Sequence, residues 1–202
     1  MLISMHTPYN VTNAFFIIYI LHSALHVGMF FQQLIFLFIT TTVLTIISMH
    51  MKTDVFPPSP YVFLLRFLHF FAFLFAITYI FFFPQETPMD IVFICYCVLL
   101  IIQWVIFGDC ILTILERRHY QNKVPNIYLH TIFGEAAREF IVFAIAVVAI
   151  YAIMVIHRQS WLPRTIRTSL IIISVPIALV VMYVQYKLYD GVVLYKPHII
   201  AL

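Results

Sequence analysis

The stretch "WVIFGDCILTILERR", residues 104–118, combines an apolar run with an acidic residue inside it and a charged end. Its apolar residues are typical of the interior of a lipid bilayer, where an isolated charge costs about 2.5 kcal/mol or more at the centre of a helix. Asp109 nevertheless lies well before the terminal charges, with Cys110 and Thr113 beside it. The stretch therefore predicts a membrane helix whose polar residues meet polar partners on neighbouring helices.

The composition of the whole chain favours the same environment. Of its 202 residues, 64% are hydrophobic and 9% are charged, whereas an ordinary soluble domain carries about a quarter charged residues. The chain has too little polar surface to cover an apolar core in water, so we expect lipid to cover most of it. The formal net charge of +3 is too small to indicate a nucleic-acid partner. We expect an all-α, polytopic integral membrane helix bundle that forms a single transmembrane domain over residues 1–202.

Apolar runs and the breaks between them predict about five transmembrane helices. One upright crossing needs about 20 apolar residues, and the first run, residues 14–51, is much longer and contains no charged residue. Because this run has no proline and only Gly28, we expect one long or bent helix there. The other predicted spans lie at about residues 61–83, 89–116, 132–157 and 165–187. A hairpin in the first run, giving six spans, is the alternative.

Lysine and arginine residues in the predicted loops indicate the orientation of the bundle. With five spans, one side holds Lys52, Arg117, Arg118, Lys123, Lys187 and Lys196, and the other holds Arg158, Arg164 and Arg167, with Glu86 and Asp90 nearby. Because basic loops tend to stay in the cytoplasm, the N-terminus is expected outside and the C-terminus on the cytoplasmic or matrix side. No lysine or arginine precedes the first apolar run, so neither a signal peptide nor an Arg-rich presequence is expected.

Charged residues of three predicted spans fall at one depth on the cytoplasmic side. At a rise of about 1.5 Å per residue, Arg66 lies about 8 Å in, Asp109 about 10 Å, and the charged residues of the fourth span about 6 to 12 Å. We expect a polar cluster at this depth, and its members are Arg66, His69, Asp109, Thr113, Glu116, Glu135, Arg138 and Glu139.

The spacing of these residues suggests how the polar cluster is paired. Asp109, Thr113 and Glu116 are spaced at i, i+4 and i+7, so they share one stripe of a helix. We expect Arg66 to pair with Asp109. We also expect Glu135 to pair with Arg138, which lies three residues further on the same face. Glu139 is then left to be protonated or to meet His69.

The polar cluster has two interpretations. In the first, its ion pairs only specify the order and register of helices whose apolar faces all look alike. In the second, the same residues form a proton or ion path, or a pocket for a lipid headgroup or a quinone. Arg117, Arg118 and Lys123 are candidates for binding an anionic headgroup at the cytoplasmic leaflet.

His22 and His26 form a second group of interest, because their spacing of one helical turn can hold a metal ion. Membrane haem sites need axial histidines on different helices, and His69 could supply one. Desaturase-type iron oxygenases use several histidine-rich boxes, whereas this chain has one such pair. Histidines that bond to neighbours or lie at the interface explain the pair better. We therefore predict no metal and no cofactor, keep haem or quinone as an alternative, and expect bound lipid.

The pattern W-x-x-x-G-x-C-x-L-T-x-L-E at residues 104–116 resembles a signature of an uncharacterised family of small bacterial polytopic membrane proteins. In that family it appears as a helix that ends in C-P-L-T-x-L-E. The matching positions are Trp104, Cys110, Leu112, Thr113, Leu115 and Glu116. Ile111 stands where the family has proline. The resemblance implies a bundle of several membrane helices and carries no activity with it.

Motifs of the common enzyme classes are absent from the sequence. It contains no G-x-x-x-x-G-K-[ST], G-x-S-x-G or H-E-x-x-H, and no potassium-filter sequence. Only Pro176 lies well inside a predicted span, which argues against a carrier built on broken helices. We expect a non-catalytic subunit or scaffold that packs on partner membrane proteins or ordered lipids.

Two other functions stay open. The first is a proton- or ion-conducting or small-solute transport protein that uses Asp109, Glu116, Glu135 and Arg138. The second is a haem- or quinone-binding redox subunit, for which the candidates are His22, His26 and His69.

Overall fold

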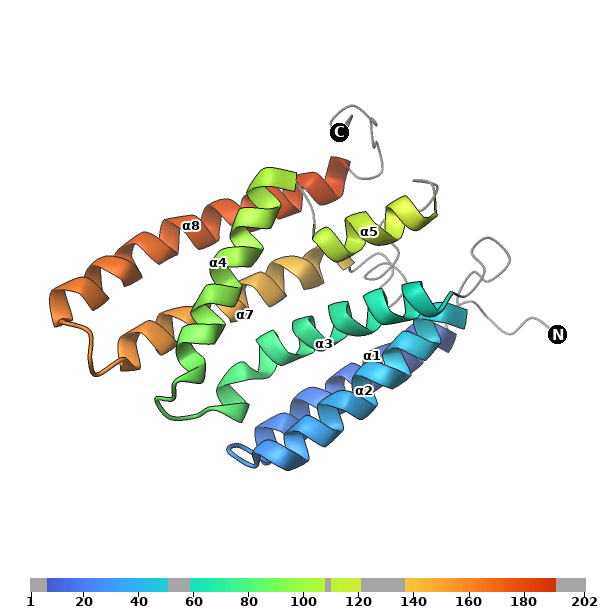
Figure 1. The fold of residues 1–202 in the computed structure, drawn as a ribbon, viewed down its shortest axis with the longest axis horizontal. Helices are drawn as coiled ribbons and strands as arrows, with labels where there is room; N and C mark the ends of the chain where they lie inside the picture. Colours follow the sequence, from blue (N-terminus) through green and yellow to red (C-terminus); the bar gives the residue numbers. More distant parts are fainter. Residues whose placement is uncertain (1–6, 51–58, 108–109, 121–136, 192–202) are drawn as a thin grey trace.

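The computed structural model describes residues 7–50, 59–107, 110–120 and 137–191, and in these residues the chain is all-helical (Figure 1). In chain order the helices are α1 (Thr7–Leu25), α2 (Phe30–His50), α3 (Pro60–Phe82), α4 (Met89–Phe107), α5 (Ile111–His119), α7 (Ala137–Arg158) and α8 (Arg164–Gly191). The prediction of an all-α chain is confirmed for the part that the structure describes.

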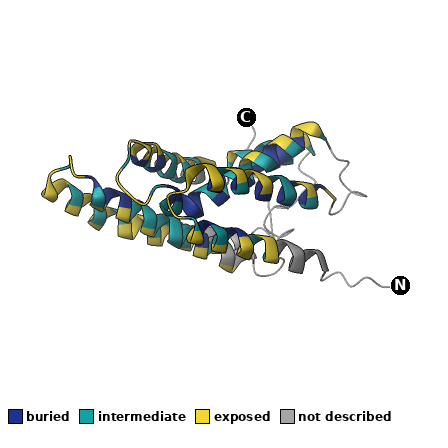
Figure 2. Ribbon diagram, turned by 90° about the horizontal axis from the view of Figure 1, so that it is seen from below, coloured by how far each residue is buried: buried dark blue, intermediate teal, exposed yellow. Residues whose placement is uncertain are grey.

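Helix α3 is the centre of the arrangement. It contacts α1 and α2 on one side and α5 and α7 on the other, while α8 packs on α7 and α4 leans across α7 (Figure 1). Two apolar clusters surround α3: one joins it to α1, α2 and α7, and the other joins it to α4 and α7. Figure 2 shows buried positions in the middle of the bundle and exposed positions on the outer faces of the helices.

The ends of the described helices gather at two ends of the bundle (Figure 1). The α1–α2 turn (residues 26–29), the α3–α4 connector (83–88) and the α7–α8 connector (159–163) lie together at one end, which we call the turn end. The start of α1, the end of α2, the start of α3, helix α5 and the end of α8 lie at the other, which we call the α5 end.

The first apolar run forms a hairpin of two helices, so the prediction of one long helix over residues 14–51 is wrong. Gly28 makes the reversal with φ of 78°, a left-handed conformation that glycine adopts without the steric cost of a Cβ atom. The turn is also held from outside: the Gly28 N–H donates to the Phe81 carbonyl at 2.8 Å, and Gln33 Nε2 donates to the same carbonyl at 2.9 Å. One glycine is enough to form this turn because α3 supplies the hydrogen-bond acceptor for its N–H group.

The single helix predicted over residues 89–116 is divided into α4 and α5. Cys110, the N-cap of α5, has an extended backbone, with φ of −68° and ψ of 134°. This conformation resets the direction of the chain between the two helices. The other predicted spans agree with α3, α7 and α8 to within a few residues over the described part of the chain.

Three helices of the described residues are long and apolar enough to cross a membrane: Phe30–His50, Pro60–Phe82 and Arg164–Val184. Shorter apolar stretches occur at Asn13–Leu25, Met89–Gln103 and Val142–Arg158. No residue of the apolar window in α8 is buried inside the bundle, an exposure that a soluble protein rarely tolerates over a contiguous area. These features support a membrane protein.

The left-handed turn generates a first prediction. Gly28→Ala is expected to lower the free energy of unfolding by about 1–2 kcal/mol, because an alanine pays the steric cost of the left-handed conformation. A Cβ atom at this position would meet Pro84 Cγ at 3.7 Å, an ordinary contact, so the loss would come from the backbone and not from a clash. Thermal unfolding in detergent, followed by circular dichroism, measures the change.

Gly28→Asn is the matched control, because asparagine enters the left-handed region more readily than alanine. It should lose less stability than Gly28→Ala. Equal melting temperatures for both variants and the wild type would contradict the described turn.

Candidate functional site

Two arginines, one at each end of the bundle, have the same kind of surroundings. Arg66, in the second turn of α3, and Arg158, the last residue of α7, each donate to a carboxylate on a second helix. Each also donates to a backbone carbonyl at the C-terminal end of a third helix. We call these groups the α5-end junction (Arg66, Glu116, Ser48) and the turn-end junction (Arg158, Asp90, Phe83).

The α5-end junction joins α2, α3 and α5. Arg66 Nε and Nη2 both donate to Glu116 Oε1, at 3.0 and 2.6 Å. Arg66 Nη1 donates to the Ser48 carbonyl at 2.5 Å. The side chains of Arg66 and Glu116 are 3% and 2% exposed. A charged pair this deeply buried is stable only when its remaining donors are also satisfied, and the Ser48 carbonyl contributes to that here.

The carbonyl acceptors in both junctions follow from helix geometry. The last four carbonyls of an α-helix lack a partner within the helix and carry partial negative charge. Ser48 lies in the last turn of α2, and Phe83 is the C-cap of α3. In a bilayer such groups must be satisfied within the protein, because water is absent. Each arginine therefore neutralises a carboxylate and a helix end together.

Glu116 depends on Arg66 for its charge. It lies on α5, which has nine residues and is outside the candidate membrane-spanning helices. Burial raises the pKa of the Glu116 carboxyl above its usual range, and the hydrogen bonds and charge of Arg66 oppose this shift. The second oxygen, Oε2, is buried without a hydrogen-bond partner among the described residues. Without Arg66, the carboxyl would favour its neutral form.

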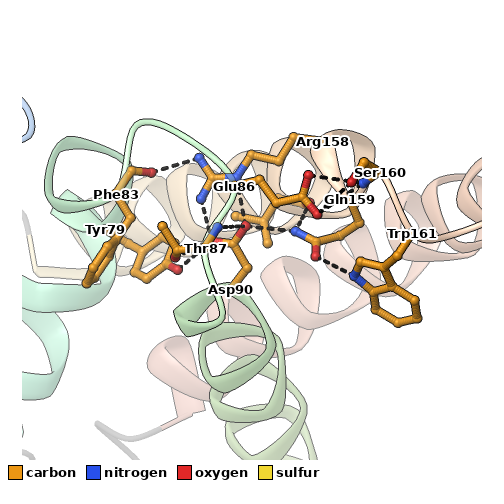
Figure 3. A network of polar contacts seen from close by, with 10 residues as sticks. Tyr79, Phe83, Glu86, Thr87, Asp90, Arg158, Gln159, Ser160 and Trp161 are labelled. Atoms are coloured by element: carbon orange, nitrogen blue, oxygen red, sulfur yellow. Dashed lines mark hydrogen bonds and ion pairs between the residues drawn. The ribbon is translucent and has the colours of Figure 1, made fainter.

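The turn-end junction joins α3, α4 and α7 (Figure 3). Arg158 Nε donates to Asp90 Oδ2 at 2.9 Å, and Arg158 Nη2 donates to Asp90 Oδ1. Arg158 Nη1 donates to the Phe83 carbonyl at 2.7 Å. Asp90 also accepts from the Tyr79 hydroxyl and from Gln159 Nε2, each at 2.7 Å. Asp90 is 1% exposed and Arg158 16%, so this junction lies nearer to the surface of the bundle.

An exposed layer covers the turn-end junction (Figure 3). Glu86, in the α3–α4 connector, accepts from the Ser160 backbone N–H at 3.1 Å and from the Ser160 hydroxyl at 3.2 Å. Trp161 Nε1 donates to Gln159 Oε1 at 2.9 Å. These bonds hold the α3–α4 and α7–α8 connectors together at the turn end.

Part of the predicted polar cluster is brought together at the α5 end. Arg66 meets Glu116, and Thr113 is buried three residues before Glu116 on the same face of α5. Asp109, Glu135 and Lys123 lie outside the described residues. The predicted pairs Arg66–Asp109 and Glu135–Arg138 therefore stay predictions.

The other predicted site residues are dispersed. His69 is half-buried one turn beyond Arg66 on α3, Arg138 lies in the first turn of α7, and Glu139 follows it and is exposed. A contact between His69 and Glu139 stays a prediction. At the end of α5, Arg117 is half-buried and Arg118 is exposed.

His22 of α1 packs on His26 of the α1–α2 turn and on Phe36 of α2. The ring centroids of the two histidines lie 4.2 Å apart, and the His22 ring stacks on Phe36 at 3.9 Å. His26 Nδ1 lies 2.9 Å from the His22 carbonyl. Within the described parts of the chain, no three His, Cys, Asp or Glu side chains are grouped so that they could hold a metal ion. The His22 ring contributes to the contact between α1 and α2.

Sequence reasoning missed the turn-end junction. From the sequence, Asp90 and Arg158 are expected to be loop charges that mark orientation, and nothing there distinguishes Tyr79 or Gln159. The sequence does contain one signal for this junction. Asp90 and Arg158 each lie within two residues of the end of an apolar run, and both lie on the same side of the predicted topology. A charge at that position lies at the edge of the hydrocarbon, where it needs a partner.

Comparison with known proteins returns no match: no family model, no curated protein and no solved structure matches the chain. The resemblance of residues 104–116 to a bacterial membrane family therefore stays a prediction.

The α5-end junction generates a prediction about stability. Arg66→Met is expected to lower the free energy of unfolding by about 3–5 kcal/mol, because it leaves the Glu116 carboxyl buried without its counter-ion. Arg66→Met combined with Glu116→Leu should be much milder, since no charge then remains to be buried. Unfolding in detergent–denaturant mixtures gives the free energies of the wild type, the two single variants Arg66→Met and Glu116→Leu, and the double variant. If the double variant loses the sum of the single losses, the two side chains are not coupled as described.

A parallel comparison tests the turn-end junction. Asp90→Asn leaves the Arg158 guanidinium without a counter-ion and is expected to cost about 3 kcal/mol or more. Glu86→Gln also removes one carboxylate charge from this end, but its site is exposed, so the loss should stay within about 1 kcal/mol. Melting temperatures in one detergent rank the variants. Similar losses for both would show that the buried network contributes no more than the exposed layer.

Proposed function

We propose that the protein is a non-catalytic integral membrane protein that acts as a structural subunit or scaffold. One observation carries the proposal: the wholly or partly buried charges of the two junctions are engaged in contacts between helices. Arg66, Glu116, Asp90 and Arg158 each bond across to another helix. This use of charge favours a fixed arrangement of helices over a moving or reactive one.

The bonding at both junctions supports this interpretation. Arg66 uses all three of its guanidinium nitrogens as donors, and both oxygens of Asp90 accept from other side chains. An ion path needs groups that can exchange partners with water or with the ion. Charged side chains that bond to several partners at once instead help to specify the order and register of the helices.

Charged and aromatic residues along α8 and next to it support a transmembrane orientation along the bundle axis. Arg167 and Lys187 are separated by about 30 Å of helix at a rise of 1.5 Å per residue, which equals the thickness of the hydrocarbon core, about 30 Å. Exposed Trp161 lies beyond one end, and exposed Tyr183 and Tyr186 lie near the other. Aromatic residues of this kind gather at the two membrane interfaces.

The hairpin in the first run changes the expected topology. With six crossings, by α1, α2, α3, α4, α7 and α8, the start of α1 and the end of α8 lie on one side of the membrane, in place of the two sides expected for five spans. That side is the α5 end, which carries Arg117, Arg118 and Lys187. We infer from the positive-inside tendency that it faces the cytoplasm or matrix.

The surface of α8 suits a scaffold. Its large apolar side chains are exposed along the whole apolar window. In a membrane this surface is covered by lipid or by the helix of a partner protein. A structural subunit would use it to bind the partner helix. We therefore propose partner membrane proteins or ordered lipids as the binding partners.

Proton conduction through the α5-end junction is the second candidate function. The observation that favours it is the Glu116 carboxyl, whose Oε2 atom is buried without a hydrogen-bond partner among the described residues. Thr113, buried on the same face of α5, adds a hydroxyl near it. A carboxyl of this kind can exchange a proton if water reaches it.

Proton flux in reconstituted vesicles separates the two candidates. We expect wild-type protein to give the same decay of a pH gradient as empty vesicles, measured with a trapped pH-sensitive dye and a potassium ionophore. The doubly substituted Arg66→Met/Glu116→Leu protein is the matched control. A flux that occurs in the wild type and is lost in Glu116→Gln would replace the scaffold proposal with conduction.

Native mass spectrometry after extraction in a mild detergent tests the scaffold proposal directly. A structural subunit should retain a second membrane protein or a stoichiometric number of lipids. A bare monomer that neither binds a partner nor conducts protons would contradict the proposal.

A further inference from the structure

Helix α5 has an inner face that is fixed to the bundle. Thr113 and Glu116, three residues apart, are its buried residues, and Glu116 is bonded to Arg66 of α3. The ring of His119, at the end of α5, lies 5.3 Å from the ring of Tyr61 at the start of α3. Contacts at both its middle and its end hold α5 against α3, so the direction of its outer face is set.

The outer face of α5 changes from apolar to basic along the helix. Ile111, in the first turn, is 47% exposed, and Arg118, seven residues later and close to the same face, is also exposed. Arg117 and His119 complete a basic last turn. The distance from Ile111 to Arg118 is about 10 Å at the helical rise, enough to pass from the edge of the hydrocarbon into the headgroup layer.

The positive charge of the last turn of α5 favours the binding of an anion. The one acidic residue of α5, Glu116, points inward to Arg66, so its charge is compensated inside the bundle. The basic last turn lies at the α5 end, beside the start of α3 and the end of α2 (Figure 1). An arginine in this layer offers a planar set of donors that matches two oxygens of a phosphate.

We propose that the last turn of α5 lies in the headgroup layer of the membrane and binds the phosphate of an anionic lipid through Arg118, with Arg117 beside it. The proposal rests on the proposed membrane-spanning function and extends it by naming a ligand class. Ile111 sits at the edge of the acyl chains, and the Arg66–Glu116 pair positions α5 so that its last turn meets the phosphates. A free phosphate compound carries the same chemical group, so the experiment separates the two sources.

The test titrates phosphatidylglycerol or phosphatidylcholine into the full-length protein in detergent and counts bound lipids by native mass spectrometry. Wild-type protein should bind phosphatidylglycerol more tightly. Arg118→Gln should weaken that binding roughly fivefold, and Arg117→Gln with Arg118→Gln roughly 25-fold, as expected for about 1 kcal/mol per basic residue near an anionic surface. Arg118→Lys keeps the charge and should retain most of the binding.

Arg164→Gln is the matched control, because Arg164 is also exposed but starts α8 at the opposite end. It removes the same charge and should leave phosphatidylglycerol binding unchanged. An equal loss in Arg164→Gln and Arg118→Gln would overturn the proposal, since it would show a general effect of net charge. Equal binding of the two lipids by the wild type would overturn it as well.

Two further measurements show which part of the proposal is wrong if the expected lipid binding is not found. If glycerol 3-phosphate in solution displaces phosphatidylglycerol at comparable concentration, the phosphate site exists but a lipid is not its specific ligand, and the proposal is wrong on that point. Resistance of the protein to extraction from membranes by alkaline carbonate reports insertion separately. Inserted protein that shows no preference for anionic lipid refutes the headgroup site alone, whereas extractable protein refutes the proposed function.

Discussion

An arginine that bridges a carboxylate and the carbonyl end of a helix is the interaction on which this bundle depends. It occurs twice, with Arg66 on Glu116 and Ser48 and with Arg158 on Asp90 and Phe83. Apolar side chains in lipid gain little from packing on one helix in place of another, because acyl chains are equally apolar. Directional bonds between charged and carbonyl groups are therefore what select neighbours, and each junction selects three helices at once.

The two junctions also explain why the helix ends can be buried. The carbonyls at the end of α3 are satisfied by the Gly28 N–H, by Gln33 and by Arg158, all from outside α3. The end of α2 is satisfied in the same way by Arg66. Helix termini without water would otherwise leave polar groups unpaired, at a cost of several kcal/mol for each group in hydrocarbon. This bonding fixes which helix ends lie next to one another, as the proposed structural role requires.

Most helices could be predicted because each needs only local information. The apolar run that ends before Pro84 predicts α3, and the run that precedes the "HRQSW" connector predicts α7. The hairpin at Gly28 could not be predicted with the same security, since a single glycine is a weak turn signal and its hydrogen-bond acceptor lies on α3. The break at Cys110 and the burial of Asp90 could not be predicted from the sequence either. For Asp90, a charge at the edge of an apolar run looks the same in the sequence whether its side chain faces lipid headgroups or a partner on another helix.

The sequence by itself determined that the chain is helical and belongs in a membrane, since 64% hydrophobic residues and 9% charged residues leave too little polar surface for water. It also determined that a few charges must find partners, because isolated charges are costly in hydrocarbon. Only the tertiary structure decided which partners these are: Glu116 for Arg66 and Asp90 for Arg158. The physical reason is that pairing depends on which helix ends meet in space, and that is set by turns and contacts far apart in the chain.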